Sequence, residues 1–205
     1  MRFISTLRLS LVIGLTFLLA SCSKPQLPIL SPNDTIVAFG DSLTFGVGSR
    51  EGETYPEILS ELTGLSVINA GISGETTSGG LKRFEKVLDE YKPELVILME
   101  GGNDILRNQN SLRSKQNLAE MIQIAQSKNV AVILIGVPEK KLFSDSAPFY
   151  SELADEHQLV FDDEILSTLL RTAKYKSDPI HLNNAGYRKF AERIQQMLIE
   201  HGAIY

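Results

Sequence analysis

The sequence predicts an α/β fold in which helices cover both faces of a parallel sheet of five strands. Two observations predict this fold. Short apolar runs alternate along the chain with segments whose apolar residues recur at helical spacing, which is typical of strand–helix units. The runs are also too continuously apolar for strands with one solvated face. A length of 205 residues indicates a single domain.

The first two predicted strands flank a helix with clear start and stop signals. Apolar runs at 35–39 and 65–69 predict the strands. Between them, Thr54 and Glu57 have the spacing of a capping box, and Gly64 supplies a stop. The apolar face of this helix consists of Tyr55, Ile58, Leu59 and Leu62.

The same alternation continues to the end of the chain. Further strands are expected at 95–99, 130–135 and 159–161. Further helices are expected at 81–91, around 118–125, near 144–157 and at 187–198. The last helix has the clearest apolar face, formed by Tyr187, Phe190, Ala191, Ile194, Met197 and Leu198.

The first 21 residues predict a secretory signal peptide that is not part of the fold. Arg2 and Arg8 form a basic start, an apolar run covers 9–19, and two small residues follow. The run is too short to span a membrane. A buried strand or helix is the alternative, but no core element requires this order of basic, apolar and small residues.

Leu-Ala-Ser-Cys at 19–22 resembles the lipobox of bacterial lipoproteins, in which the cysteine is lipidated and becomes the first residue. Cys22 is the only cysteine, so it cannot form an internal disulfide, and a buried free cysteine is the alternative. The resemblance implies a lipid-anchored protein of the bacterial cell envelope. By the same resemblance, Ser23 favours the outer membrane over the inner one. We expect the domain on the periplasmic face, but the sequence leaves the exterior face open.

Residues 22–34 are predicted to be the lipidated N-terminus and a tether, and residues 35–205 the folded domain. The segment 23–33 contains three prolines and has no apolar periodicity. Fully extended at about 3.1 Å per residue, it would reach about 34 Å and hold the domain clear of the lipid headgroups.

The composition excludes several classes of function. The net charge is −5, and no stripe of Lys and Arg is present, so nucleic acid is not an expected partner. The sequence has no cluster of Cys and His residues and no phosphate-binding loop. It therefore implies no metal and no cofactor.

Four short polar blocks lie far apart in the sequence. The first three follow the first three predicted strands, and the fourth precedes the last helix. Ligands of parallel sheets bind at the carboxyl ends of the strands, so at least three blocks should meet at one edge. The blocks are Phe-Gly-Asp-Ser-Leu-Thr at 39–44, Asn-Ala-Gly-Ile-Ser-Gly-Glu-Thr at 69–76, Gly-Gly-Asn-Asp at 101–104 and Asp-Pro-Ile-His at 178–181.

Ser42 is the candidate nucleophile, and a serine hydroxyl needs a base to remove its proton. The chain has three histidines. His157 ends a predicted helix, and His201 is expected on a frayed, solvated turn near the C-terminus. His181 follows Asp178 by three residues, so one loop can deliver both the base and the carboxylate that orients it. An ordinary N-cap serine and an ordinary loop histidine are the alternatives.

Attack on an acyl carbonyl creates an oxyanion that needs hydrogen-bond donors. The backbone N–H groups of Ser42 and Gly74 and the side-chain amide of Asn103 are suitable donors. Gly74 and Asn103 are also common turn residues, which is the alternative for each. For Asp41 and Asp104 we expect hydrogen bonds that shape their loops rather than a role as the triad acid.

From Ile36 to Leu198, the blocks in this order resemble SGNH hydrolases of the GDSL type, in the branch of bacterial arylesterases, acyl-CoA thioesterase I and lysophospholipase L1. The resemblance implies a three-layer α/β/α, flavodoxin-like fold. It also implies a serine carboxylic ester hydrolase without a cofactor, which cleaves acyl esters or thioesters of small molecules or lipids through an acyl-serine intermediate. Ser42, Asp178 and His181 would be catalytic, and Ser42, Gly74 and Asn103 would form the oxyanion hole.

The chain departs from this family in the fourth block, where Asp-Pro-Ile-His-Leu replaces Asp-Gly-x-His-Pro, so the backbone of the loop can differ. No Gly-x-Ser-x-Gly surrounds Ser42, which separates the chain from the α/β-hydrolases. Candidates for an acyl groove are the segment 136–143 and Phe45, Val47, Ile72 and Leu106, each of which could equally belong to the core.

Two other functions remain open at this point. The same site could remove acetyl groups from an envelope polysaccharide, or the chain could be a non-catalytic envelope lipoprotein. The blocks carry no information on acyl chain length or on oligomeric state.

Overall fold

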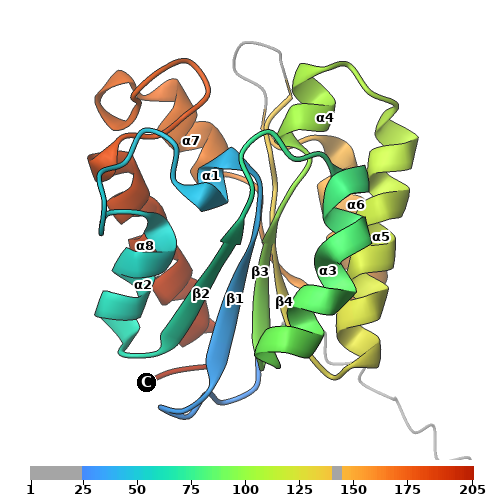
Figure 1. The fold of residues 1–205 in the computed structure, drawn as a ribbon, viewed down its shortest axis with the longest axis vertical. Coiled ribbons are helices and arrows are strands. Elements are labelled where there is room, and N and C mark those ends of the chain that lie inside the picture. The colour runs from blue at the N-terminus through green and yellow to red at the C-terminus, as the bar shows by residue number, and fades with distance from the viewer. Residues whose placement is uncertain (1–24, 140–144) are drawn as a thin grey trace, which may run out of the picture.

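The computed structural model describes residues 25–139 and 145–205. Five strands form one parallel sheet in the order β2-β1-β3-β4-β5 (Figure 1). The predicted α/β class with a five-stranded parallel sheet is therefore confirmed. The strands are β1 (Thr35–Gly40), β2 (Ser66–Gly71), β3 (Leu95–Met99), β4 (Ala131–Ile135) and β5 (Val160–Asp162).

The centre of the sheet is buried on both faces. All residues of β3 are buried, and so are all residues of β1 and β4 except the first of each. β2 lies at the edge of the sheet and is only partly buried. This gradient explains why β3 and β4 have continuously apolar sequences, as expected of parallel strands covered by helices.

Helices form a layer on each face of the sheet (Figure 1). One layer contains α2 (Tyr55–Thr63), α7 (Ile165–Arg171) and α8 (Asn184–Glu200), with α8 in contact with both of the others. The other layer contains α3 (Thr77–Tyr91), α5 (Ser111–Ser127) and α6 (Pro148–His157), with α5 between its neighbours. The short helices α1 (Ser42–Phe45) and α4 (Gly102–Leu106) and the 3₁₀ turn η1 (Ala173–Tyr175) complete the fold.

The start and stop signals of α2 act as predicted. The Thr54 hydroxyl accepts a hydrogen bond from the N–H of Glu57, and the Glu57 carboxylate accepts one from the N–H of Thr54 at 3.0 Å. Gly64 follows the helix with a φ of 71°, a left-handed conformation that suits glycine. The capping box and the glycine stop are therefore confirmed.

Three helices are missing from the sequence prediction, and one starts later than expected. The helix expected from residue 144 begins at Pro148. α1, α4 and α7 have four, five and seven residues. Such lengths cover two turns of helix or fewer, which is too short for a periodic pattern to stand out.

The prediction of a free tether through residue 33 is wrong from Leu27 onward. Leu27 and Leu30 are both buried against the domain. Their N–H groups donate to the carbonyls of His201 at 3.0 Å and Ala203 at 2.8 Å. These bonds hold the segment along the end of the domain where the C-terminus lies (Figure 1). From Leu27 to Leu30 the segment is therefore packed on the domain and does not act as a spacer.

His201 is also not on a frayed, solvated turn. Its side chain is half-buried, and its Nδ1 lies 2.6 Å from the carbonyl oxygen of Pro25. His157 ends α6, as predicted.

The signal peptide and Cys22 lie outside the described residues, and none of the described helices has the length and apolar character needed to cross a membrane.

Candidate active site

The site lies at the edge of the sheet where the parallel strands end. α1 follows β1, the loop 72–76 follows β2, and α4 follows β3. These elements lie together at the upper end of the molecule (Figure 1). The prediction that the first three blocks meet at one edge is therefore confirmed.

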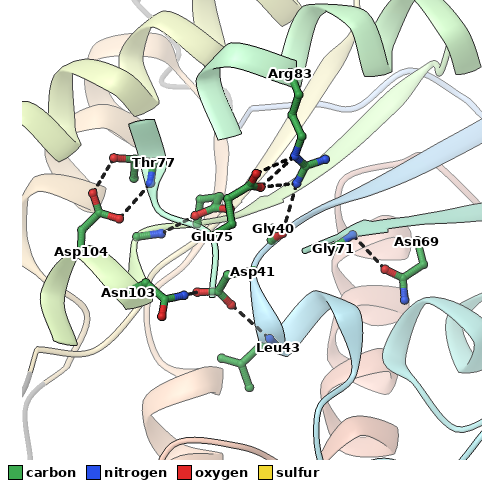
Figure 2. Close-up of polar contacts among 12 residues, drawn as sticks. Gly40, Asp41, Leu43, Asn69, Gly71, Glu75, Thr77, Arg83, Asn103 and Asp104 are labelled. Carbon is green, nitrogen blue, oxygen red and sulfur yellow. Dashed lines mark hydrogen bonds and ion pairs between the residues drawn. The ribbon is translucent and has the colours of Figure 1, made fainter. Parts of the chain in front are cut away.

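The chain turns directly from β1 into α1, which makes Ser42 the first residue of the helix. Asp41 caps this helix by accepting a hydrogen bond from the N–H of Leu43 at 3.1 Å. The end of β2 allows α1 to approach closely, because a Cβ on Gly71 would lie 2.1 Å from the backbone nitrogen of Phe45. Asn69 supports this strand end by accepting from the N–H of Gly71 at 3.0 Å (Figure 2).

The ring of His181 lies beside the hydroxyl of Ser42. Its Nε2 is 3.0 Å from Ser42 Oγ, although the two residues are 139 positions apart. Only 15% of the His181 side chain is exposed. The structure therefore brings together the two residues that the sequence analysis paired.

Asp178 lies on the other side of the His181 ring. Its Oδ2 is 2.7 Å from His181 Nδ1, and its Oδ1 accepts from the N–H groups of Ile180 and His181, each at 2.9 Å. Burial raises the pKa of Asp178, but the hydrogen bonds from His181 and Ile180 outweigh it, so the pKa of this carboxyl is lowered. An ionised Asp178 accepts a hydrogen bond from Nδ1–H and so keeps the proton on Nδ1, and this tautomer leaves Nε2 free to accept from the Ser42 hydroxyl.

The loop that carries Asp178 and His181 is held by the start of α8. Asn183 caps this helix, and its amide donates to the carbonyls of Lys174 at 2.9 Å and Lys176 at 3.0 Å. The N–H of Ser177 donates to the His181 carbonyl at 3.1 Å, which closes the loop. The loop thus holds Asp178 against His181 although Pro-Ile stands where the family has Gly-x.

Asn103 lies on α4, and its side-chain amide faces Asp41. The Nδ2 atom donates to Asp41 Oδ2 at 3.3 Å (Figure 2). An amide nitrogen carries two hydrogens, so one is left for another acceptor. Ser42 and Asn103 line the same pocket, so a ligand that bound there would lie near both.

Gly74 lies in the loop between β2 and α3 with a φ of 80°. Its carbonyl accepts a hydrogen bond from Arg107 at 3.0 Å, and Arg107 directly follows α4. This bond ties the loop of Gly74 to the helix of Asn103. The role of the Gly74 N–H in an oxyanion hole stays a prediction.

Asp104 makes the second tie between these two segments. Its carboxylate accepts from the N–H of Thr77 at 2.9 Å and from the Thr77 hydroxyl at 2.7 Å (Figure 2). It also accepts from the hydroxyl of Ser114 on α5 at 3.0 Å. The loop-shaping hydrogen bonds that the sequence analysis expected for Asp41 and Asp104 are both present.

A cluster of acidic side chains lies beneath the site. Glu75 pairs with Arg83, whose Nε donates to both carboxylate oxygens at 2.9 and 2.8 Å (Figure 2). Glu100 has no exposed surface; the N–H of Gly101 donates to its Oε2 at 3.1 Å, and its Oε1 has no hydrogen-bond partner among the described residues. Burial, followed by the charges of Asp41 and Glu75, raises the pKa of Glu100 well above its usual value.

Asp41 belongs to the same cluster and is 4% exposed. Burial raises its pKa to about 6, although the N–H of Leu43 and the charge of His181 act in the opposite direction. The sequence analysis did not anticipate the contact of Asp41 with Asn103 or the burial of Glu100. The only sequence signal for these features is position: Asp41 and Glu100 are acidic residues that directly follow the buried strands β1 and β3.

A pocket of about 650 Å³ opens beside Ser42. Leu106, Val137, Leu170 and Ile180 supply apolar wall to it. Leu106 and residues 137–139 were predicted to line a groove and do so, whereas residues 140–143 lie outside the described residues. Phe45, Val47, Ile72 and Gly136, which were also predicted to line it, do not.

The sequence analysis also missed the wall that α7 supplies through Leu170. The apolar positions of 165–170 were a usable signal, but the short helix was not predicted.

Among the residues that the structure describes, no group of three or more His, Cys, Asp or Glu side chains is placed to hold a metal ion.

The arrangement combines a hydroxyl, an imidazole within hydrogen-bond distance of it, a carboxylate that orients the imidazole, and an amide donor beside the pocket. These are the groups that acyl transfer requires. Residues 38–189, which contain all of them, match the GDSL-like Lipase/Acylhydrolase family.

Comparison with individual proteins also finds similarity to esterases. An arylesterase of Vibrio mimicus is 29% identical over 180 residues, which cover 82% of this chain and 90% of that protein. Esterase TesA of Pseudomonas aeruginosa is 36% identical over 108 residues, which cover 50% of this chain and 54% of that protein. The chain thus matches only about half the length of that esterase. A crystal structure of TesA superposes with a TM-score of 0.74 at 27% identity, covering 82% of this chain and 99% of the other.

Proposed function

Because the chain belongs to the GDSL-like Lipase/Acylhydrolase family and is a hydrolase of the SGNH/GDSL esterase type, we propose that it cleaves acyl esters or thioesters through an acyl-enzyme on Ser42. The observation that carries this proposal is the distance of 3.0 Å between Ser42 Oγ and His181 Nε2. A base at this distance can take the hydroxyl proton as the oxygen attacks.

In the first half of the cycle, His181 Nε2 accepts the proton of Ser42 while Oγ bonds to the acyl carbon. The resulting tetrahedral intermediate collapses, the bond to the leaving alcohol or thiol breaks, and the imidazolium returns its proton to that group. In the second half, His181 takes a proton from water as the water oxygen attacks the acyl-serine, and the imidazolium then returns that proton to Ser42 Oγ as the acyl–oxygen bond breaks and the carboxylic acid leaves. Asp178 stabilises the imidazolium in both halves.

The negative charge of each tetrahedral intermediate develops on the former carbonyl oxygen. We assign its stabilisation to the N–H groups of Ser42 and Gly74 and the amide of Asn103. Each such donor contributes on the order of 3 kcal/mol to lowering the barrier. The bonds of Arg107 to Gly74 and of Asp104 to Thr77 support this assignment, because they fix the two segments that would supply donors.

The pocket favours an acyl chain longer than acetyl. Its volume of about 650 Å³ is far larger than an acetyl group requires, and several of its walls are apolar. We therefore favour aryl, thioester or lysophospholipid substrates over acetylated polysaccharide. Comparing the hydrolysis of p-nitrophenyl acetate, p-nitrophenyl octanoate, lysophosphatidylcholine and acetylated glycan tests this choice; a preference for the glycan would overturn it.

Labelling with a fluorophosphonate probe tests the nucleophile. We expect the intact protein to be labelled and the Ser42→Ala variant not to be. Ser60→Ala is a suitable control, because Ser60 lies in α2, its hydroxyl donates to the Leu65 carbonyl, it does not line the pocket, and its loss should not affect labelling. Equal labelling of the intact protein and Ser42→Ala would remove Ser42 from the reaction.

We also propose that the protein is anchored to the outer membrane of a bacterial envelope through lipid on Cys22, with the domain on the periplasmic side. The order of basic, apolar and small residues before Cys22 supports this proposal. Metabolic labelling with a fatty acid should be lost in Cys22→Ala, and labelling that persists would refute the anchor.

Such an anchor would turn the pocket away from the membrane that holds it. Three residue steps of extended chain reach at most about 11 Å, so a lipid on Cys22 would hold Pro25 close to the membrane. Pro25 contacts His201 at the end of α8, whereas His181 lies just before its start, and 17 helical residues span about 26 Å. The lipidated protein should therefore hydrolyse soluble p-nitrophenyl butyrate but not a non-exchanging long-chain ester in its own vesicles.

A long insertion between Cys22 and Pro25 provides the matched variant for this orientation. About 20 Gly and Ser residues add roughly 25 Å of flexible reach. We expect hydrolysis of the bilayer ester to appear while the rate on the soluble ester stays the same. Equal hydrolysis of the bilayer ester with and without the insertion would refute the orientation and leave the esterase proposal intact.

A further inference from the structure

Asp41 is a buried carboxylate that the proposed reaction cycle does not use. Its two oxygens accept from two different groups, the N–H of Leu43 and the Nδ2 of Asn103 (Figure 2). The first bond caps α1 and explains why an aspartate suits this position. The second reaches α4, 62 residues further along the chain, and needs another explanation.

The second bond determines which way the amide of Asn103 points. The oxygen and nitrogen of an amide have nearly the same size, so only hydrogen-bond partners decide between its two orientations. An ionised carboxylate can only accept, so it requires the Nδ2 of Asn103 to face it. Since Nδ2 has a second hydrogen, this orientation also keeps a donor available to the pocket that Asn103 lines.

We infer that Asp41 is a positioning residue of the oxyanion hole, whose ionised carboxylate holds the Asn103 amide with its nitrogen toward the pocket rather than its oxygen. The inference rests on the oxyanion role proposed for Asn103. With the amide reversed, the carbonyl oxygen of Asn103 would be presented where negative charge develops, and the donor would become a repulsive group.

The charge of Asp41 is set by its surroundings. His181 favours the ionised form, and Asp104 and Glu75 oppose it, although Glu75 is paired with Arg83. Glu100 adjoins Asp41, and burial favours the neutral form of Glu100. The other titratable groups whose pKa values respond to Asp41 are the hydroxyls of Tyr55, Tyr150 and Tyr187.

Acid should therefore impair the site in two ways. Protonation of His181 removes the base. Protonation of Asp41, whose pKa burial raises to about 6, turns one carboxylate oxygen into a hydroxyl that can donate to the Asn103 oxygen and reverse the amide. Because a neutral Asp41 is expected to cost about 10- to 100-fold, loss of both states gives log kcat/KM a slope approaching two over the first one to two pH units of the acid side, whereas loss of the base alone gives about one.

The decisive variant is Asp41→Asn. Asparagine can still cap α1 through its Oδ1, so the bond to Leu43 is retained. Its own Nδ2 then faces Asn103, and two donors cannot bond, so the Asn103 amide reverses. We expect kcat to fall on the order of 10- to 100-fold with little change in KM, and the acid slope to fall from about two to about one.

A double-mutant cycle with Asn103→Ala tests whether Asp41 acts through Asn103. We expect Asp41→Asn to reduce kcat by less than about twofold when Asn103 is already alanine. The acid slope of Asn103→Ala should itself be about one. This second measurement needs no Asp41 variant, so it tests the inference even if Asp41→Asn does not fold.

Asp162→Asn is the matched control. Asp162 is also a buried aspartate at the end of a strand, and it caps the next helix through the N–H groups of Glu164 and Ile165. It pairs with Arg193 and does not line the pocket. The control should lower stability and leave both kcat and the acid slope unchanged.

Three results would overturn the inference. They are a slope that stays near two in Asp41→Asn or in Asn103→Ala, losses in kcat that multiply in the double variant, and full activity of Asn103→Ala. The last result would also remove Asn103 from the oxyanion hole. Fluorophosphonate labelling of Ser42 would still report on the proposed function independently.

Discussion

The loop that carries Asp178 and the strand end that carries Asp41 supply the site with carboxylates from opposite environments. The Asp178 side chain is 44% exposed, whereas Asp41 is 4% exposed. The pKa of Asp178 is lowered and that of Asp41 is raised to about 6. The two residues are chemically identical, so the difference comes from their surroundings alone.

The difference follows from the balance of desolvation and hydrogen bonding. Asp178 accepts two backbone N–H bonds and one from the His181 ring, and these outweigh its modest burial. Asp41 accepts one backbone N–H and one neutral amide, which do not offset its nearly complete burial. A carboxylate that must stay charged while a proton moves next to it is therefore the one on the exposed loop.

The buried carboxylate suits a different task. The bond from Asn103 to Asp41 depends more on a fixed position of the carboxylate than on a carboxylate that stays charged at every pH. The packed end of β1 provides that fixed position. Asp178 and Asp41 thus contribute to one site in different ways. Asp178 controls the proton, and Asp41 controls the orientation of the Asn103 amide. Variants that affect only one of these contributions test whether Asp178 and Asp41 have separate tasks.

The largest expected effect comes from His181→Ala, which removes the group that Asp178 orients. We expect kcat for p-nitrophenyl butyrate to fall by about 10⁴- to 10⁶-fold, with residual activity from the oxyanion donors and binding. His157→Ala, at the end of α6, is the control and should retain full activity. A loss of less than about tenfold in His181→Ala would contradict its role as the base.

The next largest effect is expected from Asp178→Asn. An asparagine here can donate to Nδ1 and favour the tautomer in which Nε2 carries the proton, so Nε2 can no longer accept from Ser42. We expect kcat to fall by about 10³- to 10⁴-fold near pH 7, well beyond the loss in Asp41→Asn. Steady-state kinetics of the two variants side by side provide the measurement. Equal losses would mean that the exposed and buried carboxylates do not have separate tasks.

The sequence was sufficient to predict the parts of the site that short-range patterns encode. Strand runs located the edge of the sheet, and the spacing of Asp178 and His181 predicted a pair that one loop delivers. Capping signals bounded α2 for the same reason, because a cap depends on residues three positions apart.

The sequence was insufficient where a contact depends on packing between distant elements. The bond from Asn103 to Asp41 depends on where α4 and α1 begin relative to the ends of the paired strands β3 and β1. No local sequence pattern encodes this relation. The burial of Leu27 and Leu30 depends on packing against the chain that follows α8, which accepts their backbone N–H bonds at His201 and Ala203. Proline content predicted an extended segment there without predicting what the segment packs against.

The pH dependence of stability tests the environments of the two carboxylates directly. The folded pKa of Asp41 is raised, so its ionisation destabilises the fold: its contribution is favourable at low pH and is lost as pH rises through about 6. From the unfolded value near 3.8 to about 6, this loss amounts to about 3 kcal/mol. The lowered pKa of Asp178 has the opposite sign, so its contribution is present at neutral pH and is lost on acidification.

Urea unfolding of the intact protein and Asp41→Asn between pH 4 and 8 provides the measurement. The difference in the free energy of unfolding should shift in favour of the variant by up to about 3 kcal/mol as pH rises. The same comparison with Asp178→Asn should change little between pH 8 and 4 and turn against the intact protein only on further acidification, because the folded pKa of Asp178 lies below 3.8. A pH-independent difference for Asp41→Asn would show that the buried carboxylate does not change its protonation over this range.

The smallest expected effect comes from Asp104→Asn, which tests whether the ties around the oxyanion donors are structural. Asn103 and Asp104 are neighbours, but Asp104 points to Thr77 and Ser114 and does not line the pocket. Asparagine keeps one acceptor oxygen and turns the other into a donor facing a group that donates, so we expect a loss of about 1 to 3 kcal/mol in the free energy of unfolding. Below the new melting temperature kcat should fall by less than about fivefold, and the acid slope should stay near two, because Asp41 still holds the Asn103 amide. A loss of slope in Asp104→Asn would assign the orientation of that amide to the whole acidic cluster instead of to Asp41.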